Sequence, residues 1–121
     1  MELKKNDLKD KKCIPCSGTI PPLKPEEIEK NCSLIHGDWK LTHHNTRLYR
    51  EFPFKNFAKP MELANIIGEM AEEEGHHPEL QVGWGHLGVE VWTHKINALV
   101  ESDFIFAAKV DEIFKNFEGR I

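Results

Sequence analysis

Two stretches of the chain place apolar residues at alternate positions, and a stretch with helical spacing separates them. The first runs from Trp39 to Phe54, and the second follows Pro78. Such alternation is typical of strands with one buried face, and a short connection inside each stretch predicts a hairpin. The alternating residues are Leu41, Leu48, Phe52 and Phe54, then Leu80, Val82 and Trp84, then Leu87, Val89, Val91 and Thr93, with connections at Asn45-Thr46 and Gly85-His86.

The segment between the hairpins, from Asn56 to Glu74, has apolar residues three and four positions apart. This spacing predicts the longest helix of the chain, with its apolar stripe toward the core. Pro60 falls in the first turn, where its missing N–H is tolerated, and Gly75 is expected to end the helix. The stripe contains Phe57, Met61, Ala64, Ile67 and Ala71, widened by Leu63, Ile66 and Met70.

Two further helices flank this pattern. The first is predicted from Pro25 to near Gly37, and the last from Glu101 to Phe117. The order α-β-β-α-β-β-α then predicts an α+β fold, with a four-stranded antiparallel sheet and three helices packed on one face. Pro53, near the end of the first hairpin, is expected at an edge position or a bulge.

The chain has 121 residues, enough for one small domain with a working core. We expect residues 25–121 to form this domain and residues 1–24 to form an irregular N-terminal arm. Residues 1–12 are predicted to be mobile and dispensable for catalysis, because their charged side chains leave little apolar surface to bury.

The charge balance argues against a nucleic-acid partner. Sixteen Lys and Arg residues stand against 20 Asp and Glu residues, a net charge of −4, so there is no basic surplus to hold phosphates. No apolar run approaches the roughly 20 residues of a membrane span, and the charged start does not resemble a secretory signal. The sequence therefore predicts a soluble, cytoplasmic protein that binds neither nucleic acid nor membrane.

Three cysteines, an odd number, do not make a disulfide framework, and reduced thiols are the simpler interpretation. Cys13 and Cys16 form a lone Cys-x-x-Cys pair. Two interpretations stay open for it: reduced thiols in a surface arm, or part of a metal site shared between subunits. Cys32 falls in the first predicted helix, where packing is expected rather than reactivity.

Residues able to exchange protons gather at the predicted ends of helices and strands. His76 and His77 follow the long helix, His94 ends the last strand, and Asp103 begins the last helix. Side chains at such ends can converge on a pocket, and successive side chains in an extended segment point in opposite directions. Histidine, with an unperturbed pKa of about 6.5, can serve as acid or base near neutrality. A polar turn without function would show the same spacing, so spacing alone leaves both interpretations open.

A longer pattern surrounds these residues. It consists of Glu72-x-x-x-His76-His77-Pro78, then a hairpin, Thr93-His94 and Asp103, preceded upstream by Trp39 and by Leu48-x-Arg50-x-Phe52-x-Phe54-x-x-Phe57. The combination resembles the signature of the pterin-4a-carbinolamine dehydratase family. The resemblance covers about residues 25 to 117.

The resemblance implies that residues 25–121 form a pterin dehydratase-like domain. Such a domain converts 4a-hydroxytetrahydropterin, a 4a-carbinolamine, to quinonoid dihydropterin and water, and so recycles the pterin of aromatic amino-acid hydroxylases without a metal or other cofactor. It further implies that His76 and His94 are acids and that His77 binds the pterin and assists proton removal. Asp103 completes the implied catalytic set. The implied substrate-binding residues are Glu72, His76, His77, Pro78, Thr93, His94, Lys95 and Ile96.

One segment departs from the family pattern. The chain has Ala98-Leu99-Val100 where the family usually has Gly-Leu followed by Thr or Ser. Val100 has no hydroxyl with which to cap the last helix, so Ser102 or Asp103 is expected to satisfy the start of that helix. The orientation of Asp103 depends on which of the two does so.

A zinc hydrolase is one alternative. It would take its ligands from a permissible set: His76, His77, His94 and Asp103. Adjacent histidines diverge in an extended segment, and no His-x-x-x-His helix supports this interpretation.

A protein-binding module is the alternative from another class. Members of the family stabilise dimers of a transcription factor in animals, and related proteins are assembly factors for a carbon-fixing enzyme. This chain keeps all three histidines, which favours the enzyme, because a scaffold has no physical need of them. The edges of a small sheet and the resemblance together predict a homodimer or homotetramer.

Overall fold

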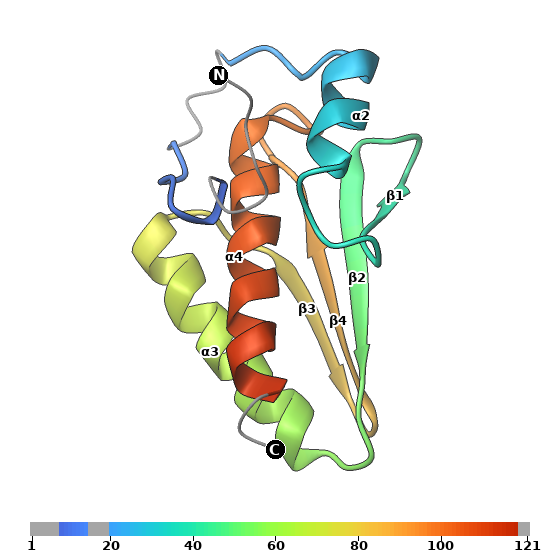
Figure 1. The fold of residues 1–121 in the computed structure, drawn as a ribbon, viewed down its shortest axis with the longest axis vertical. Coiled ribbons are helices and arrows are strands. Elements are labelled where there is room, and N and C mark those ends of the chain that lie inside the picture. Colours follow the sequence, from blue (N-terminus) through green and yellow to red (C-terminus); the bar gives the residue numbers. More distant parts are fainter. Residues whose placement is uncertain (1–7, 15–19, 119–121) are drawn as a thin grey trace.

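The chain folds into one antiparallel sheet with helices along one side (Figure 1). In this computed structural model the described residues are 8–14 and 20–118. The strand order in the sheet is β1-β2-β4-β3, so the two hairpins meet where β2 pairs with β4. The strands are β1 (Lys40–Thr42), β2 (Arg47–Pro53), β3 (Glu79–Gly83) and β4 (His86–Val91).

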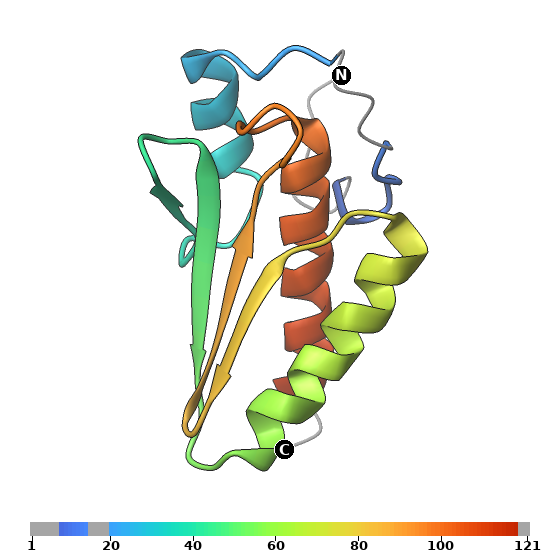
Figure 2. The ribbon, with the colours of Figure 1, turned by 180° about the vertical axis from the view of Figure 1, so that it is seen from behind.

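Three helices alternate with the hairpins: α2 (Pro25–Cys32), α3 (Ala58–Glu74) and α4 (Glu101–Glu118). Seen from opposite sides in Figures 1 and 2, α3 and α4 run along the same face of the sheet, and α2 lies near the start of α4. The predicted order α-β-β-α-β-β-α and the four-stranded antiparallel sheet are confirmed. No helix within the described residues is both long and apolar enough to cross a membrane.

The two hairpins turn in different ways. In the first, residues 43–45 all have positive φ, between 52° and 62°. In the second, the predicted connection Gly85-His86 is wrong by one residue, because Trp84 and Gly85 form the turn and His86 already belongs to β4. Gly85 has a φ of 83°, a conformation that glycine adopts without strain.

Pro53 closes β2 opposite His86 of β4. On its other side β2 pairs with β1, and that pairing reaches no further than Lys40 opposite Tyr49. In the part of the chain that the structure describes, no strand pairs with the last residues of β2 on the β1 side, so a residue without an N–H is tolerated there. The predicted edge position of Pro53 is confirmed.

The long helix ends at Glu74 as predicted but begins at Ala58, two residues after the predicted Asn56, and the first helix ends earlier than predicted. Asn56 accepts a hydrogen bond of 2.9 Å from the Lys59 N–H ahead of α3, and Gly75 ends α3 in the left-handed conformation, with φ of 65°. The helix α2 ends at Cys32, whereas the sequence predicted an end near Gly37. The apolar residues that suggested a longer helix are buried from the following turn instead: Leu34 and Ile35.

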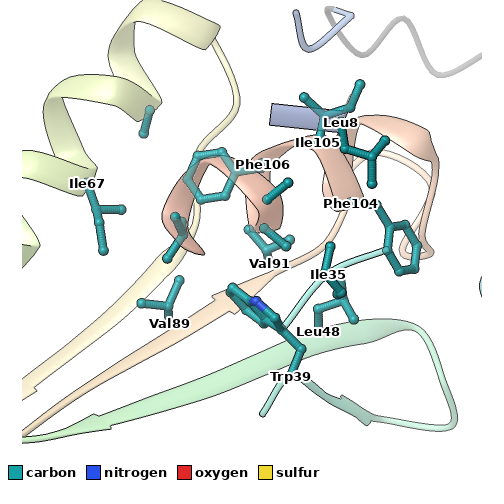
Figure 3. Packing of buried hydrophobic residues seen from close by; sticks show 14 of the residues in the cluster. Leu8, Ile35, Trp39, Leu48, Ile67, Val89, Val91, Phe104, Ile105 and Phe106 are labelled. Carbon is teal, nitrogen blue, oxygen red and sulfur yellow. The ribbon is translucent and has the colours of Figure 1, made fainter. Parts of the chain in front are cut away.

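The core lies between the sheet and its helices (Figure 3). In Figure 3, Val89 and Val91 of β4 lie beneath Phe106 of α4, with Ile67 of α3 to one side. All four side chains are fully buried. Burying one such side chain contributes about 1.5–3 kcal/mol, so the residues of the period-two and period-3.6 patterns stabilise the fold by packing together here.

The described part of the predicted arm also belongs to the core. Leu8 is 0% exposed and Cys13 is 7% exposed. The expectation that residues 1–12 have little to bury is therefore wrong at Leu8. Residues 1–7 lie outside the described residues, and the domain boundary at residue 24 stays a prediction.

Candidate active site

A buried carboxylate, Asp103, lies at the centre of the candidate site. Its side chain is fully buried in the first turn of α4. Oδ1 lies 2.7 Å from Nε2 of His76, and Oδ2 accepts hydrogen bonds of 2.9 Å from the Thr93 hydroxyl and from the Val100 N–H. These partners come from separate segments of the chain, and together they fix the orientation of the carboxylate.

The local sequence explains why Asp103 turns inward. Val100 stands immediately before α4 and offers no side-chain oxygen to the unpaired N–H groups of the first turn. Asp103, the third residue of the helix, accepts the Val100 N–H instead, as an acidic residue does in a capping box. Its negative charge also lies near the positive end of the helix dipole. Of the two residues predicted to satisfy the start of the helix, Asp103 does so.

His76 reaches Asp103 because the chain reverses at Gly75, directly after α3. The His76 N–H donates to the Ala71 carbonyl at 3.2 Å, and the His76 ring centroid lies 5.7 Å from that of Phe106. The histidine is buried. A carboxylate oxygen accepts, so the ring donates Nε2–H to Asp103, and Nδ1 is the ring atom that can accept a proton.

His77 points away from the buried pair. Its side chain is 59% exposed, and its Nε2 lies 2.5 Å from Oε2 of Glu72, itself exposed on the last turn of α3. Pro78 favours extended backbone at His77, and successive side chains of extended backbone alternate. The neighbouring rings therefore occupy different environments: His76 inside the protein and His77 at its surface.

His94 lies in a turn that follows β4. The strand ends at Val91, so the predicted strand residue Thr93 lies beyond it and closes the turn through an isolated bridge to Ala98. The His94 ring is exposed and packs against Trp92, with ring centroids 4.2 Å apart and ring planes tilted by 37°. The remaining predicted binding residues of this turn are Lys95, which is exposed, and Ile96, which is half-buried.

The structure separates the residues that a zinc site would need. His76 is engaged by Asp103, whereas His77 is engaged by Glu72 at the surface. Across residues 8–14 and 20–118, no three His, Cys, Asp or Glu side chains are placed to hold a metal ion together. The alternative ligand set, which also included His94, is therefore not assembled.

A recess of about 310 Å³ is lined in part by Trp92, whose ring contacts that of His94. Arg47 lies 3.8 Å from the Trp92 ring centroid and 3.1 Å from a carboxylate oxygen of Glu90. Arg47 was not among the predicted site residues, because strand alternation places it on an exposed face but does not show which ring it covers. The recess is lined by Arg47, Tyr49, Glu79, Gln81, Gly88, Glu90 and Trp92.

A larger cavity, of about 580 Å³, lies beside the second half of α4 and contains none of the predicted site residues. Its wall includes Arg50, which is 4% exposed and lies 2.6 Å from Asp111. Asp111 also accepts a hydrogen bond of 2.7 Å from the Trp39 indole. Two residues of the sequence signature, Trp39 and Arg50, therefore meet in one cluster around Asp111, which includes none of the predicted site residues His76, His77 and His94.

Fold and site together define an α+β domain whose histidines lie at the ends of strands and helices. A sequence profile described as pterin 4 alpha carbinolamine dehydratase matches residues 21–113, and the chain belongs to this family. A protein of Alkaliphilus metalliredigens is 50% identical over 109 residues, covering 88% of this chain and 96% of that protein. One of Methylococcus capsulatus is 52% identical over 104 residues, covering 85% and 90%. Both are named "Putative pterin-4-alpha-carbinolamine dehydratase".

Solved structures share the fold. A protein of Brucella melitensis, described as a transcriptional coactivator/pterin dehydratase, superposes with a TM-score of 0.70 at 25% identity, covering 77% of this chain and 98% of that one. A pterin dehydratase-like protein identified as a RuBisCO assembly factor superposes with a TM-score of 0.55 at 23% identity, covering 64% and 90%. The second likeness concerns the fold alone.

Proposed function

We propose that the protein is a dehydratase that converts 4a-hydroxytetrahydropterin to quinonoid dihydropterin and water. The observation that carries the proposal is the buried His76–Asp103 pair, since a histidine held by a carboxylate in a fixed tautomer is arranged for proton transfer. Family membership supports the same chemistry.

The reaction needs an acid and a base. The C4a hydroxyl leaves as water when an acid protonates it, and N5 loses its proton as the C4a–N5 double bond forms. Protons move and water leaves without net electron transfer, so no redox cofactor takes part. In this proposal His76 and His94 are the acids, and His77 binds the pterin and assists removal of the N5 proton. Each proton transfer is worth about 10²- to 10⁴-fold in rate.

The carboxylates orient two of the three rings. Asp103 holds Nε2 of His76, and Glu72 lies against Nε2 of His77. His94 is supported differently, by ring contact with Trp92. The proposed substrate-binding residues are Glu72, His76, His77, Pro78, Thr93, His94, Lys95 and Ile96.

The proposed biological setting follows from the substrate. An aromatic amino-acid hydroxylase is the kind of enzyme that releases the 4a-carbinolamine, and we place the protein with it in the cytoplasm. A homodimer or homotetramer is proposed as well. Within the described residues β3 pairs with β4 alone. The unpaired edge of β3 can pair with a strand from a second subunit and join the two sheets.

The test is the rate of quinonoid dihydropterin formation from 4a-hydroxytetrahydropterin generated by a hydroxylase, with and without the protein. Acceleration in proportion to protein concentration is expected. An unchanged rate with folded protein would reject the dehydratase.

The second candidate is a protein-binding module on the same fold. The Brucella melitensis protein, described as both coactivator and dehydratase, is the observation that favours it. The buried His76–Asp103 pair favours the enzyme, because the capping of α4 explains the buried Asp103 but not the polar histidine ring that is buried against it.

A further inference from the structure

A segment that the family profile does not include contacts the end of α3 and the start of α4, the two elements that position His76 and Asp103. The profile begins at residue 21, and the segment comprises residues 8–14. In Figure 1 this blue segment lies beside the beginning of α4 and close to the end of α3. Leu8 anchors it in the core, where Figure 3 shows it next to Ile105 of α4.

The segment binds the end of α3 through Glu74. The Cys13 N–H donates to Oε1 of Glu74 at 2.9 Å, and the Lys109 ammonium of α4 lies 3.7 Å from Oε2. Lys109 also donates to the Lys9 carbonyl at 2.9 Å. The Glu74 side chain is only 8% exposed, so these contacts are shielded from water and hold the carboxylate in place.

The segment binds the start of α4 through Ser102. The Ile14 N–H donates to Oγ of Ser102 at 2.8 Å, and the Cys13 thiol lies 3.5 Å from the Ser102 carbonyl oxygen. Ser102 is 3% exposed. Its hydroxyl is therefore engaged by the segment, which leaves the capping of α4 to Asp103.

These two contacts lie next to the buried pair in the sequence. Glu74 is two residues before His76, and Ser102 is the residue before Asp103. The 2.7 Å contact between His76 and Asp103 joins the same two elements, the end of α3 and the start of α4. Any change in the spacing of these elements changes that contact directly.

We propose that residues 8–14 are a positioning segment, which fixes the spacing of α3 and α4 and thereby the His76–Asp103 hydrogen bond. The inference rests on the proposed dehydratase function only for its effect on rate. Its structural part concerns Nε2–H of His76 and stands independently.

The test uses the full chain with Glu74→Ala and Ser102→Ala combined, which removes the two side chains that accept hydrogen bonds from the backbone N–H groups of Cys13 and Ile14. We expect kcat to fall about tenfold with KM changed by less than about twofold, because a displaced catalytic group slows chemistry more than binding. The Nε2–H proton resonance of His76, assigned by its loss in His76→Ala, should broaden or disappear as its hydrogen bond loosens.

Two controls separate positioning from general destabilisation. Glu74→Gln keeps an oxygen acceptor for the Cys13 N–H and should keep both the resonance and at least half of kcat. Ile28→Ala removes a partly buried side chain on α2 and should lower the melting temperature while the resonance stays. The proposal is overturned if the double variant keeps the wild-type resonance and kcat, or if Ile28→Ala loses both.

A failure of the proposed function gives a different result. If the wild-type protein does not accelerate dehydration, the dehydratase is rejected, and the His76 resonance alone still decides whether residues 8–14 set the hydrogen bond.

Discussion

Helix α4 carries two carboxylates that each gather three donors, and their partners differ. Asp103, in the first turn, receives the His76 ring, the Thr93 hydroxyl and the Val100 N–H. Asp111, two turns later, receives a second set: the Arg50 guanidinium, the Trp39 indole and the His36 N–H.

The difference shows which cluster can do chemistry. A histidine gains and loses a proton near neutral pH, whereas an arginine stays charged throughout. The Asp111 cluster can therefore tie β2 to α4 but cannot exchange protons, although the larger cavity lies beside it. Cavity size alone would point to the Asp111 end of α4, whereas the identity of the donors favours the Asp103 end, where the proposed active site lies.

The largest expected effect tests whether the histidines act together. Changing both His76 and His94 to Ala should lower kcat by more than about 10³-fold, because both acids are lost. Each single change should leave measurable activity if each acid serves one stereoisomer at C4a. His77→Ala should raise KM as well as lower kcat. Steady-state kinetics, with circular dichroism to monitor folding, measures these effects.

Wild-type rates in all three single variants would remove the histidines from the mechanism. Unequal rates of the His76→Ala and His94→Ala variants on separated stereoisomers would support the division of labour.

The second prediction compares the two clusters by replacing each carboxylate with its amide. Asp103→Asn should lower kcat about 100-fold, since the amide no longer enforces the His76 tautomer. Asp111→Asn leaves the buried Arg50 with only the more distant and exposed Asp38 carboxylate, 4.0 Å away, and should cost about 3 kcal/mol of unfolding free energy, with kcat of the folded protein within about twofold of wild type. Denaturant unfolding and kinetics on the same samples distinguish stability from rate. Equal effects of the two changes on kcat would erase the distinction between the clusters.

Much of the fold could be predicted because its signals are local. Alternation marked the strands, helical spacing marked α3 and α4, and Gly75 marked the end of α3. The end of α2 was missed because Leu34 and Ile35 continue the apolar pattern while the core buries them from a turn. An apolar pattern indicates which residues face the core, but it does not show whether they belong to a helix or to a turn.

The residues of the candidate site could be predicted from the sequence, but most of the contacts between them could not. The signature supplied the histidines and Asp103, and the missing hydroxyl at Val100 left Ser102 or Asp103 to cap the last helix, but nothing local shows that Asp103 would also accept the Thr93 hydroxyl. Leu8 was missed for a related reason. A single apolar residue among charged neighbours has no periodicity, and its burial depends on α4, about one hundred positions away.

The third prediction concerns how the free energy of unfolding falls at acid pH, and it tests the contacts of Glu74 at the end of α3. Burial opposes ionisation of Glu74, but the Cys13 N–H and the Lys109 ammonium outweigh it and hold the pKa of this carboxyl below its usual 4.5. A lowered pKa stabilises the folded state fully above pH 4.5, and that stabilisation is lost as pH falls through the folded value. Between about pH 6 and pH 3 the wild type should therefore lose more unfolding free energy than Glu74→Gln. Parallel pH profiles of the two proteins would show that Glu74 does not bind the segment in solution.

The last prediction concerns the reactivity of the Cys13 thiol. This reactivity reports whether residues 8–14 stay bound to the end of α3 and the start of α4. Burial, reinforced by the negative charge of Glu74, raises the pKa of Cys13 to about 12. A thiol with such a pKa is protonated at neutral pH, and only the thiolate attacks an alkylating agent. A surface thiol would be exposed to solvent, and a thiolate ligand of a shared metal would need a lowered pKa, so neither interpretation of the cysteine pair fits the buried Cys13. Cys16, the other half of that predicted pair, lies outside the described residues.

Iodoacetamide at about pH 8, followed by peptide mass spectrometry, should modify Cys13 in the folded protein at least about 100-fold more slowly than in urea. Cys32, half-buried at the end of α2, supplies an internal reference, and burial raises its pKa as well. In the combined Glu74→Ala and Ser102→Ala variant the protection of Cys13 should fall while that of Cys32 persists, because only the first thiol depends on the contacts of residues 8–14. Loss of protection at both cysteines would instead indicate general loosening, and rapid modification of Cys13 in the wild type would mean that the segment is not docked.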